Sequence, residues 1–210
     1  GDVFLNVVKK VYDSDCNYVG IKNMTITAEN DDDGDSQIVI KATNAVTSNT
    51  DAKDAKDGTT ADTSETGIWD TVDKKVSDLG SYIASVKNIE TIIEIDASTL
   101  TADTIDLESV NELKMSTQGV GIGVAVNVAS ASSMVLVKNS DLTSTKNGIK
   151  LLAKSVIESK ANAQAKAGNV AVGVSVISGS TEASITGSGT INSKKGLLVS
   201  AESNAQATTN

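Results

Sequence analysis

The feature that most constrains the fold of this chain is an internal repeat of a valine-rich segment. Val120 to Val126 reads Val-Gly-Ile-Gly-Val-Ala-Val, and further along Val170 to Val176 reads Val-Ala-Val-Gly-Val-Ser-Val. Within each copy, apolar residues alternate with small or polar ones, which is typical of a strand with one buried face. Self-similarity of this kind predicts that the copies stack on one another instead of folding independently.

A second repeat has a shorter spacing. Asn162-Ala-Gln-Ala165 recurs letter for letter as Asn204-Ala-Gln-Ala207, and these two copies lie closer together than the two valine copies. Unequal spacings between equal strands indicate loops of different length, which stacked repeats tolerate. We also expect the recurring Asn and Gln side chains to form a hydrogen-bonded ladder with a structural role.

The shortage of aromatic residues narrows the fold further. The chain has one Trp, one Phe and three Tyr, so its interior must be built from Val, Ile, Leu and Ala. Such side chains suit a narrow interior in which each layer meets a similar one. Short apolar runs occur at 38–40, 92–95, 105–107, 135–137 and 149–151. We therefore predict an all-β chain that forms a parallel β-helix (β-solenoid). A β-sandwich is the alternative, but sandwiches use many Asn-Gly hairpin turns, and this chain has only the pair that begins at Asn147.

One region interrupts the repeat pattern. Residues 50–65 are rich in Asp, Lys, Thr and Ala without an apolar period, which predicts a solvated loop. Behind it, Trp69, Val72, Val76, Leu79 and Ile83 recur at helical spacing. We expect one inserted amphipathic helix over 68–86, and three parts of the chain: strands over 1–49, the insertion over 50–88, and repetitive strands over 89–210.

Composition argues against several function classes. The chain contains neither His nor Arg. His is the side chain most used for acid-base catalysis and for metal binding near neutral pH. A formal net charge of −9 disfavours a nucleic-acid partner. No segment reaches the roughly 20 apolar residues that a membrane span needs, so we expect no membrane insertion. We predict that the chain is not an enzyme, and that its single Cys16 forms no internal disulfide.

Acidic residues provide the candidate sites. Glu29, Asp31, Asp33 and Asp35 cluster around Gly34, and carboxylate oxygens at this spacing are typical calcium ligands. However, Ile40 occupies the position where an EF-hand loop has its bidentate Glu. A solvated turn between strands is the alternative, and we predict no other cofactor. Further carboxylates are expected at outward-facing, solvated positions: Asp96, Asp103, Asp106, Glu108 and Glu112.

Two segments resemble a known class of repeats. Gly168 to Val176 (Gly-Asn-Val-Ala-Val-Gly-Val-Ser-Val) and Gly196 to Asn204 (Gly-Leu-Leu-Val-Ser-Ala-Glu-Ser-Asn) are similar to the repeats of giant bacterial surface adhesins and exoproteins of the filamentous-haemagglutinin and leukotoxin-like type. The resemblance implies an exported β-helix, extracellular or on the cell surface, that projects an adhesive or toxic module. Its partners would be a receptor or glycan on a host or neighbouring cell, or other copies of itself.

Three functional hypotheses follow from these patterns. The first is a non-enzymatic structural or adhesive β-helix segment of a large secreted or surface-displayed protein. The second is a self-assembling subunit of an extracellular filament or sheath, in which exposed strand edges pair between chains. The third is a carbohydrate-active β-helix enzyme, although the chain lacks the Arg of a common lyase constellation.

Overall fold

A computed structural model describes residues 7–29, 34–53, 82–120, 123–165 and 170–210. All regular structure in these ranges is β-strand, and every neighbouring pair of strands is parallel. The strands form three sheets. This arrangement is consistent with the predicted β-helix, and it confirms the all-β class.

The three sheets differ in strand length. Sheet A contains β1 (Val7–Lys22), β4 (Tyr82–Asp96), β7 (Val124–Lys138), β10 (Val172–Ser178) and β11 (Thr181–Thr186). Sheet B contains the short strands β2 (Thr25–Thr27), β5 (Thr99–Ala102), β8 (Asp141–Ser144) and β12 (Ile191–Ser193). Sheet C contains β3 (Gln37–Lys53), β6 (Thr104–Val120), β9 (Ile149–Gln164) and β13 (Leu197–Thr209).

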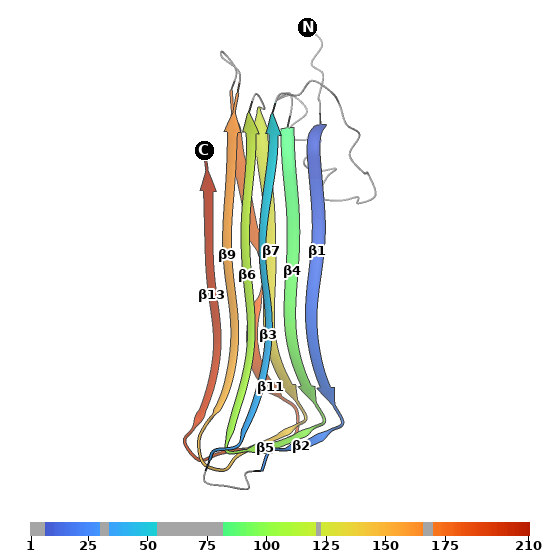
Figure 1. Cartoon of the computed structure of the whole chain (residues 1–210), viewed down its shortest axis with the longest axis vertical. Coiled ribbons are helices and arrows are strands. Elements are labelled where there is room, and N and C mark those ends of the chain that lie inside the picture. The colour runs from blue at the N-terminus through green and yellow to red at the C-terminus, as the bar shows by residue number, and fades with distance from the viewer. Residues whose placement is uncertain (1–6, 30–33, 54–81, 121–122, 166–169) are drawn as a thin grey trace.

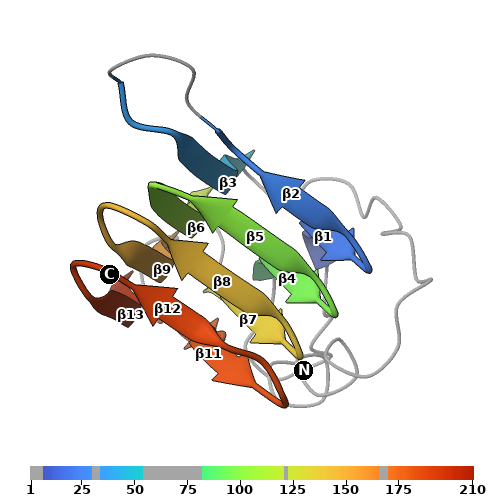
Figure 2. The same cartoon turned by 90° about the horizontal axis from the view of Figure 1, so that it is seen from below.

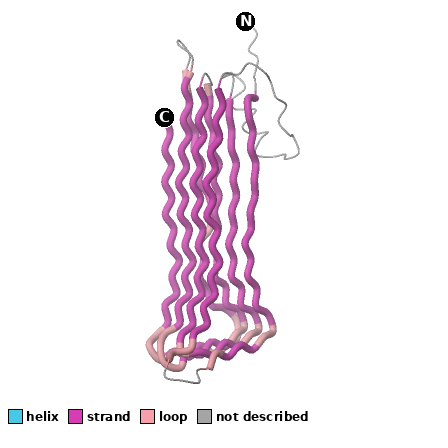
Figure 3. The backbone as a smooth tube through the Cα atoms, in the orientation of Figure 1, coloured by secondary structure: helices cyan, strands magenta, loops and turns pink. Residues whose placement is uncertain are grey.

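The chain visits sheets A, B and C in the same order four times. We call these passes units 1 to 4: β1–β2–β3, β4–β5–β6, β7–β8–β9, and β10 to β13. The long strands of sheets A and C run in opposite directions and face each other, and sheet B joins them at one end (Figure 1). Viewed from that end, the four units lie side by side (Figure 2). A long strand spans about 50 Å, so each unit is far longer than its spacing from the next (Figure 3).

Equivalent side chains of successive units share columns because the register is kept. Strands β4 and β7 pair without a break, from Tyr82 beside Val124 to Asp96 beside Lys138. Strands β6 and β9 pair in the same way, starting with Ile105 beside Ile149. The apolar runs identified in the sequence therefore lie over one another, as predicted.

The corner between sheets A and B repeats one backbone conformation. One residue in each unit has a left-handed φ there: Asn23 (53°), Ala97 (47°), Asn139 (49°) and Gly187 (80°). The backbone N–H of each of the first three donates to a carbonyl of the next unit at 3.0 to 3.1 Å. Asn and Gly tolerate this conformation better than other residues do, which explains three of the four positions but not the Ala.

The interior between sheets A and C is layered. Next to sheet B lies an apolar layer that includes Ile93, Ile95, Leu107, Val135 and Leu151. Further along the strands comes a lower polar layer of Thr91, Ser109, Asn111 and Ser133. A second apolar layer contains Ile89, Leu113, Met115, Ala129 and Ile157. An upper polar layer follows, made of Thr50, Ser85, Thr117 and Asn127.

The polar layers join the two facing sheets. In the lower layer, the Thr91 hydroxyl donates to the Asn111 side-chain oxygen, and Asn111 Nδ2 donates to the Ser132 carbonyl at 2.5 Å. In the upper layer, the Thr117 hydroxyl donates to the Asn127 side-chain oxygen, and Asn127 Nδ2 donates to the Lys160 carbonyl at 2.7 Å. Polar interior side chains therefore hold the two sheets together at specific positions.

The predicted inserted helix is wrong where it can be compared with the structure. Its last part, residues 82–86, begins strand β4 and pairs with β7. Residues 54–81, which hold the rest of the expected helix and most of the acidic loop, lie outside the described residues. Strand β3 continues to Lys53, so strands occupy both ends of the segment 50–88.

The repeats identified by letter matching are close to the structural register but do not coincide with it. The valine match pairs Val124 with Val174, whereas the structure places Val124 beside Val172, so the match is wrong by two positions. A shift of two keeps every side chain on its own face, which is why the pattern looks correct. The Asn-Ala-Gln-Ala ladder is wrong: Asn204 lies beside Val156, and Gln206 beside Glu158.

The repeated valines themselves do not line the interior between sheets A and C. Ala125 and Ala129 of β7 belong to interior clusters, and the Asn127 between them bonds across the interior. Because successive side chains of a strand point to opposite faces, Val124 and Val126 lie on the other side of sheet A, where both are nonetheless buried. Small side chains therefore face inward here, which lets sheets A and C approach each other.

Candidate functional site: the open edge of unit 4

The predicted calcium ligands are only partly described. Asp31 and Asp33 lie outside the described residues, while Glu29 is exposed. Asp35 accepts a hydrogen bond from Asn147 Nδ2 at 3.1 Å and lies 3.5 Å from Lys146 Nζ. Within the described part of the chain, no three acidic or sulfur-bearing residues gather as a metal site would require. Calcium binding by Glu29, Asp31, Asp33 and Asp35 stays a prediction.

Asp103 corrects our expectation of a solvated carboxylate. It is buried at the corner between β5 and β6, where it accepts hydrogen bonds from the Thr145 hydroxyl and, at 3.0 Å, from the Ser36 backbone N–H. Lys146 Nζ lies 3.1 Å away. These donors, with the Thr145 hydroxyl foremost, lower the pKa of Asp103 to about 2. Its role is to tie the corners of units 1, 2 and 3 together.

Glu94 has a comparable environment on the outer face of sheet A. Tyr18 Oη donates to one carboxylate oxygen at 2.6 Å, and Lys22 Nζ lies 2.9 Å from the same oxygen. Lys138 Nζ lies 2.9 Å from the other oxygen. These three donors lower the pKa of Glu94 to about 2. A carboxylate held ionised in this way joins three neighbouring strands, whereas a general acid needs its pKa raised.

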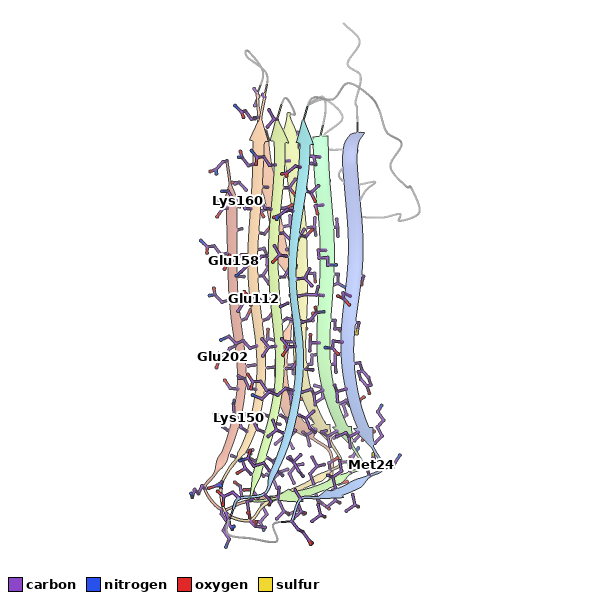
Figure 4. All side chains as sticks on the ribbon, in the orientation of Figure 1. Met24, Glu112, Lys150, Glu158, Lys160 and Glu202 are labelled. Atoms are coloured by element: carbon purple, nitrogen blue, oxygen red, sulfur yellow. The ribbon has the colours of Figure 1, made fainter. Side chains whose placement is uncertain are left out.

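The outer face of sheet C carries similar ion pairs and a groove. Lys41 pairs with Glu108 at 3.0 Å, and the Lys41 ammonium lowers the pKa of Glu108. A shallow groove of about 390 Å³ follows the column of Gly148 and Gly196. Of its charged residues, Asp106 and Lys150 lie 3.6 Å apart, which is an ion pair without a hydrogen bond, and Lys195 donates to the Asn147 side-chain oxygen at 2.8 Å. Each of these charged groups therefore already has a partner within the protein. Figure 4 labels several outward residues of this face: Glu112, Lys150, Glu158, Lys160 and Glu202.

The feature that the sequence analysis missed is the open edge of unit 4. Leu151 on β9 is fully buried, but its neighbour in the same column on β13, Val199, is 40% exposed. Leu197 is 45% exposed although the Ile149 beside it is buried. Val174 of β10 is also exposed, on the outer side of sheet A. No described residue covers these side chains or pairs with the outer edges of β12 and β13.

Unit 1 has a matching open edge at the opposite face. Strands β1, β2 and β3 each end their sheet, so each has one edge that pairs with no described residue. Exposed large side chains lie along it: Tyr18, Met24 and Val39. The edge could not be predicted from local alternation, because Val19 and Ile21 alternate with polar or small residues as the apolar residues of central strands do. Only the stacking order reveals the two edges.

Comparisons with known proteins add no family. No family model matches the chain, and the searches of curated proteins and of solved structures found no match. Among the described residues there is no helix that could span a membrane. The open edges, and the ion pairs on the outer faces, are therefore the features from which a function can be argued.

Proposed function

We propose that this chain is a non-enzymatic structural segment of a parallel β-helix, in which units 1 to 4 are successive coils. The observation that carries the proposal is the kept register. In the central units every residue of β6 from Ile105 to Val120 lies beside a residue of β9 at constant offset. Stacking of this kind forms a backbone ladder that continues from coil to coil, and a rigid ladder suits reach and presentation.

The side chains support the same role. Ion pairs and buried hydrogen bonds connect neighbouring coils: Glu94 contacts β1 and β7, and Asp103 contacts the corners on both sides of it. Such contacts resist sliding of one coil against the next. The resemblance to repeats of bacterial surface adhesins and exoproteins is consistent with a stalk or spacer that is secreted or displayed on a cell surface.

Pulling a single molecule by its two ends tests the proposal. Coils that bear load in series release one at a time, and because Tyr82 lies beside Val124, one coil consists of positions 82–123. Release of this coil should therefore lengthen the chain by roughly 150 Å, since an extended residue spans about 3.5 Å. Release of unit 1, where Lys9 lies beside Ile83, should give a longer step of roughly 260 Å. A series of such steps is the expected result. One step that releases the whole described length at once would contradict a coil-by-coil structural element.

A matched variant sharpens the pulling experiment. Glu94→Gln removes the carboxylate that joins β4 to both of its neighbours, so the steps that involve these strands should occur at lower force. Glu202→Gln is the control, because this carboxylate lies 4.0 Å from Lys154 with both side chains about half exposed. Equal forces for the two variants would show that the ion pairs between coils do not contribute to the resistance.

A further inference from the structure

We propose that two copies of this chain associate head to tail, with unit 4 of one copy stacked in register on unit 1 of the next. The inference rests on the proposed coil structure and adds the partner, its orientation and its register. A strand edge with unpaired N–H and C=O groups is a template for another strand.

The columns of the interior continue from one edge to the other. In sheet C, the column of Ile38, Ile105 and Ile149 ends at Leu197. Placing Ile38 of a second copy beside Leu197 continues this column with an aliphatic side chain. The same placement in sheet B sets Ile26 of the second copy beside Ile191, because the two share a column with Leu100 and Leu142.

The outer face provides a stronger match. Within the chain, the column next to the groove contains Val39, Asp106, Lys150 and Leu198. Its two central members pair as ions, but its two end members are apolar and exposed, Val39 by 49% and Leu198 by 54%. Head-to-tail stacking makes these two side chains neighbours. An apolar residue at each open end of an otherwise charged column is what a junction between copies requires.

Charged side chains of both signs lie near the same junction. Lys195 lies at the sheet B to sheet C corner of unit 4, and Asp35 lies at the corresponding corner of unit 1 with half of its side chain exposed. On sheet C, Ser200 faces Lys41 of the next copy, and Glu202 comes two positions after Ser200. Within its own chain Asp35 already accepts from Asn147, Lys195 donates to Asn147 at 2.8 Å, and Lys41 pairs with Glu108, so the junction depends mainly on its apolar columns.

The orientation determines the kind of assembly. A contact between two different surfaces of the same molecule does not close on itself unless the rotation closes a ring, so it builds a filament. Pairing of unit 4 with unit 4 would instead give a closed dimer with two-fold symmetry. That alternative places neither Val39 beside Leu198 nor Asp35 near Lys195. The residues on the two edges therefore favour the filament.

One inward residue of unit 1 acts against stacking and limits its strength. Asp15 on β1 shares its column with the buried Ile89 and Ala131, so its carboxylate points towards the interior at the open edge. An inward charge on an end strand is a known protection against edge-to-edge pairing. Stacking must desolvate this carboxylate, and we therefore expect filaments only at high protein concentration.

The exposed Cys16 allows a direct test of the register. Cys16 on β1 shares its column with Glu90 and Ser132. Ser180 belongs to the same column, because the next residue, Thr181, lies beside Ser133. In the proposed stack, Ser180 of one copy lies beside Cys16 of the next, at the spacing of adjacent strands, about 4.8 Å. This spacing is within the Cα separation that a disulfide spans.

The experiment is to oxidise the Ser180→Cys variant of the whole chain, or to treat it with a short reagent that carries two thiol-reactive groups. Because burial and Glu90 raise the pKa of the Cys16 thiol, the reaction is run at mildly alkaline pH and high protein concentration. The expected product is a ladder of covalent dimers, trimers and longer oligomers, with Cys16 linked to residue 180. The matched control is Ser184→Cys, on the same face of β11 but beside Gly20, roughly 13 Å further along the strand. It should form no such ladder.

A second set of variants tests the edge without cross-linking. Ala201 faces the interior from β13 and is exposed, so Ala201→Lys is tolerated by the single chain but places a charge inside the junction. We expect the concentration needed for filaments, seen by electron microscopy and sedimentation, to rise at least about tenfold. Asp15→Val should lower it, because it removes the opposing charge. Asn204→Lys, which points outward from β13 and lies beside the uncharged Ala45 of the next copy, should leave it unchanged.

Two outcomes would overturn the proposal. One is a chain that stays monomeric at all concentrations, even as Asp15→Val, with no ladder from Ser180→Cys. The other is cross-linking of Cys16 to Cys16, or of position 180 to itself, as a two-fold dimer would give. Either result is compatible with coil-by-coil extension of single molecules, so failure of the stacking and failure of the proposed structural role are separately visible.

Discussion

The apolar and polar layers of the interior occupy equivalent strands but act in different ways. Ile93, Leu107 and Val135 fill the layer beside sheet B with aliphatic side chains that have no specific partner atoms. In the lower polar layer, Thr91 and Asn111 each bond to one particular group across the interior. Aliphatic layers therefore provide most of the stabilising burial, while polar layers determine which residue of sheet A faces which residue of sheet C.

The largest expected effect lies in the apolar layer. Leu107→Ala should reduce the free energy of unfolding by about 3 kcal/mol, because it removes buried methyl groups and leaves a cavity. The control is Leu152→Ala, which truncates an outward-facing leucine next to Leu151 and should cost less than about 1 kcal/mol. Chemical denaturation measures both. Equal losses would mean that the layer beside sheet B is not the main source of burial.

The next effect lies in the lower polar layer. Asn111→Ala leaves the Thr91 hydroxyl and the Ser132 carbonyl without their partner in the interior. We expect a loss of about 2 kcal/mol in the free energy of unfolding. Asn204→Ala, at an exposed position of β13, is the control and should change stability by only a few tenths of a kcal/mol. If Asn111→Ala changed neither the free energy of unfolding nor the chemical-shift dispersion in NMR spectra, the polar layer would not have the role described here.

The next effect belongs to the ion pairs of Glu94 on the outer face of sheet A, whose contribution to stability depends on pH. Because the folded-state pKa of Glu94 is lowered to about 2, its ionised form stabilises the folded state above the ordinary pKa of 4.5. That contribution is lost as the pH falls from about 4.5 towards 2. Glu94→Gln should cost about 1 kcal/mol at neutral pH, reduced further by salt. The stabilities of the two proteins should converge as the pH approaches 2, and a constant difference across this range would contradict the assignment.

The smallest expected effect is a gain in stability at the corner between sheets A and B, outside both layers. Ala97 has a φ of 47°, in a column whose other members are Asn and Gly. Ala97→Gly should therefore raise the free energy of unfolding by about 0.5 kcal/mol, since the strain relieved exceeds the added freedom of the unfolded chain. Ala153→Gly, in the buried middle of β9, should instead lower it. Thermal denaturation of both variants shows whether the stability rises for the first and falls for the second.

The strand content and the stacked columns could be predicted from the sequence because they depend on local alternation. Ile105 to Leu107 and Ile149 to Leu151 have the same pattern, and the structure places them side by side. The offset between copies could not be predicted as well. Valine and glycine recur so often that a shift of two positions gives an equally good match, and loop length, which letter matching does not see, determines the true offset.

The site could be predicted less well than the fold. Asp103 has the same local sequence character as the exposed Asp141, and only the corner formed by Ser36 and Thr145 shows that it is buried. The helix expectation failed at 82–86 because Ile83 and Val86 fit a helical spacing by coincidence, while long-range pairing with β7 determines their conformation. Short apolar patterns do not distinguish these two structures.

The central claim is that strands far apart in the sequence stack in parallel and in one register. The most direct measurement uses Cys16 and the variant Glu90→Cys, which places a second thiol beside it on the neighbouring strand. Rapid cross-linking within one chain is the predicted result, identified by mass spectrometry of the linked peptides. Asn88→Cys, two positions away on the same face and beside Ser14, should react slowly. Preferential linkage at residue 88, or no linkage within the chain at residue 90, would contradict the stacked register.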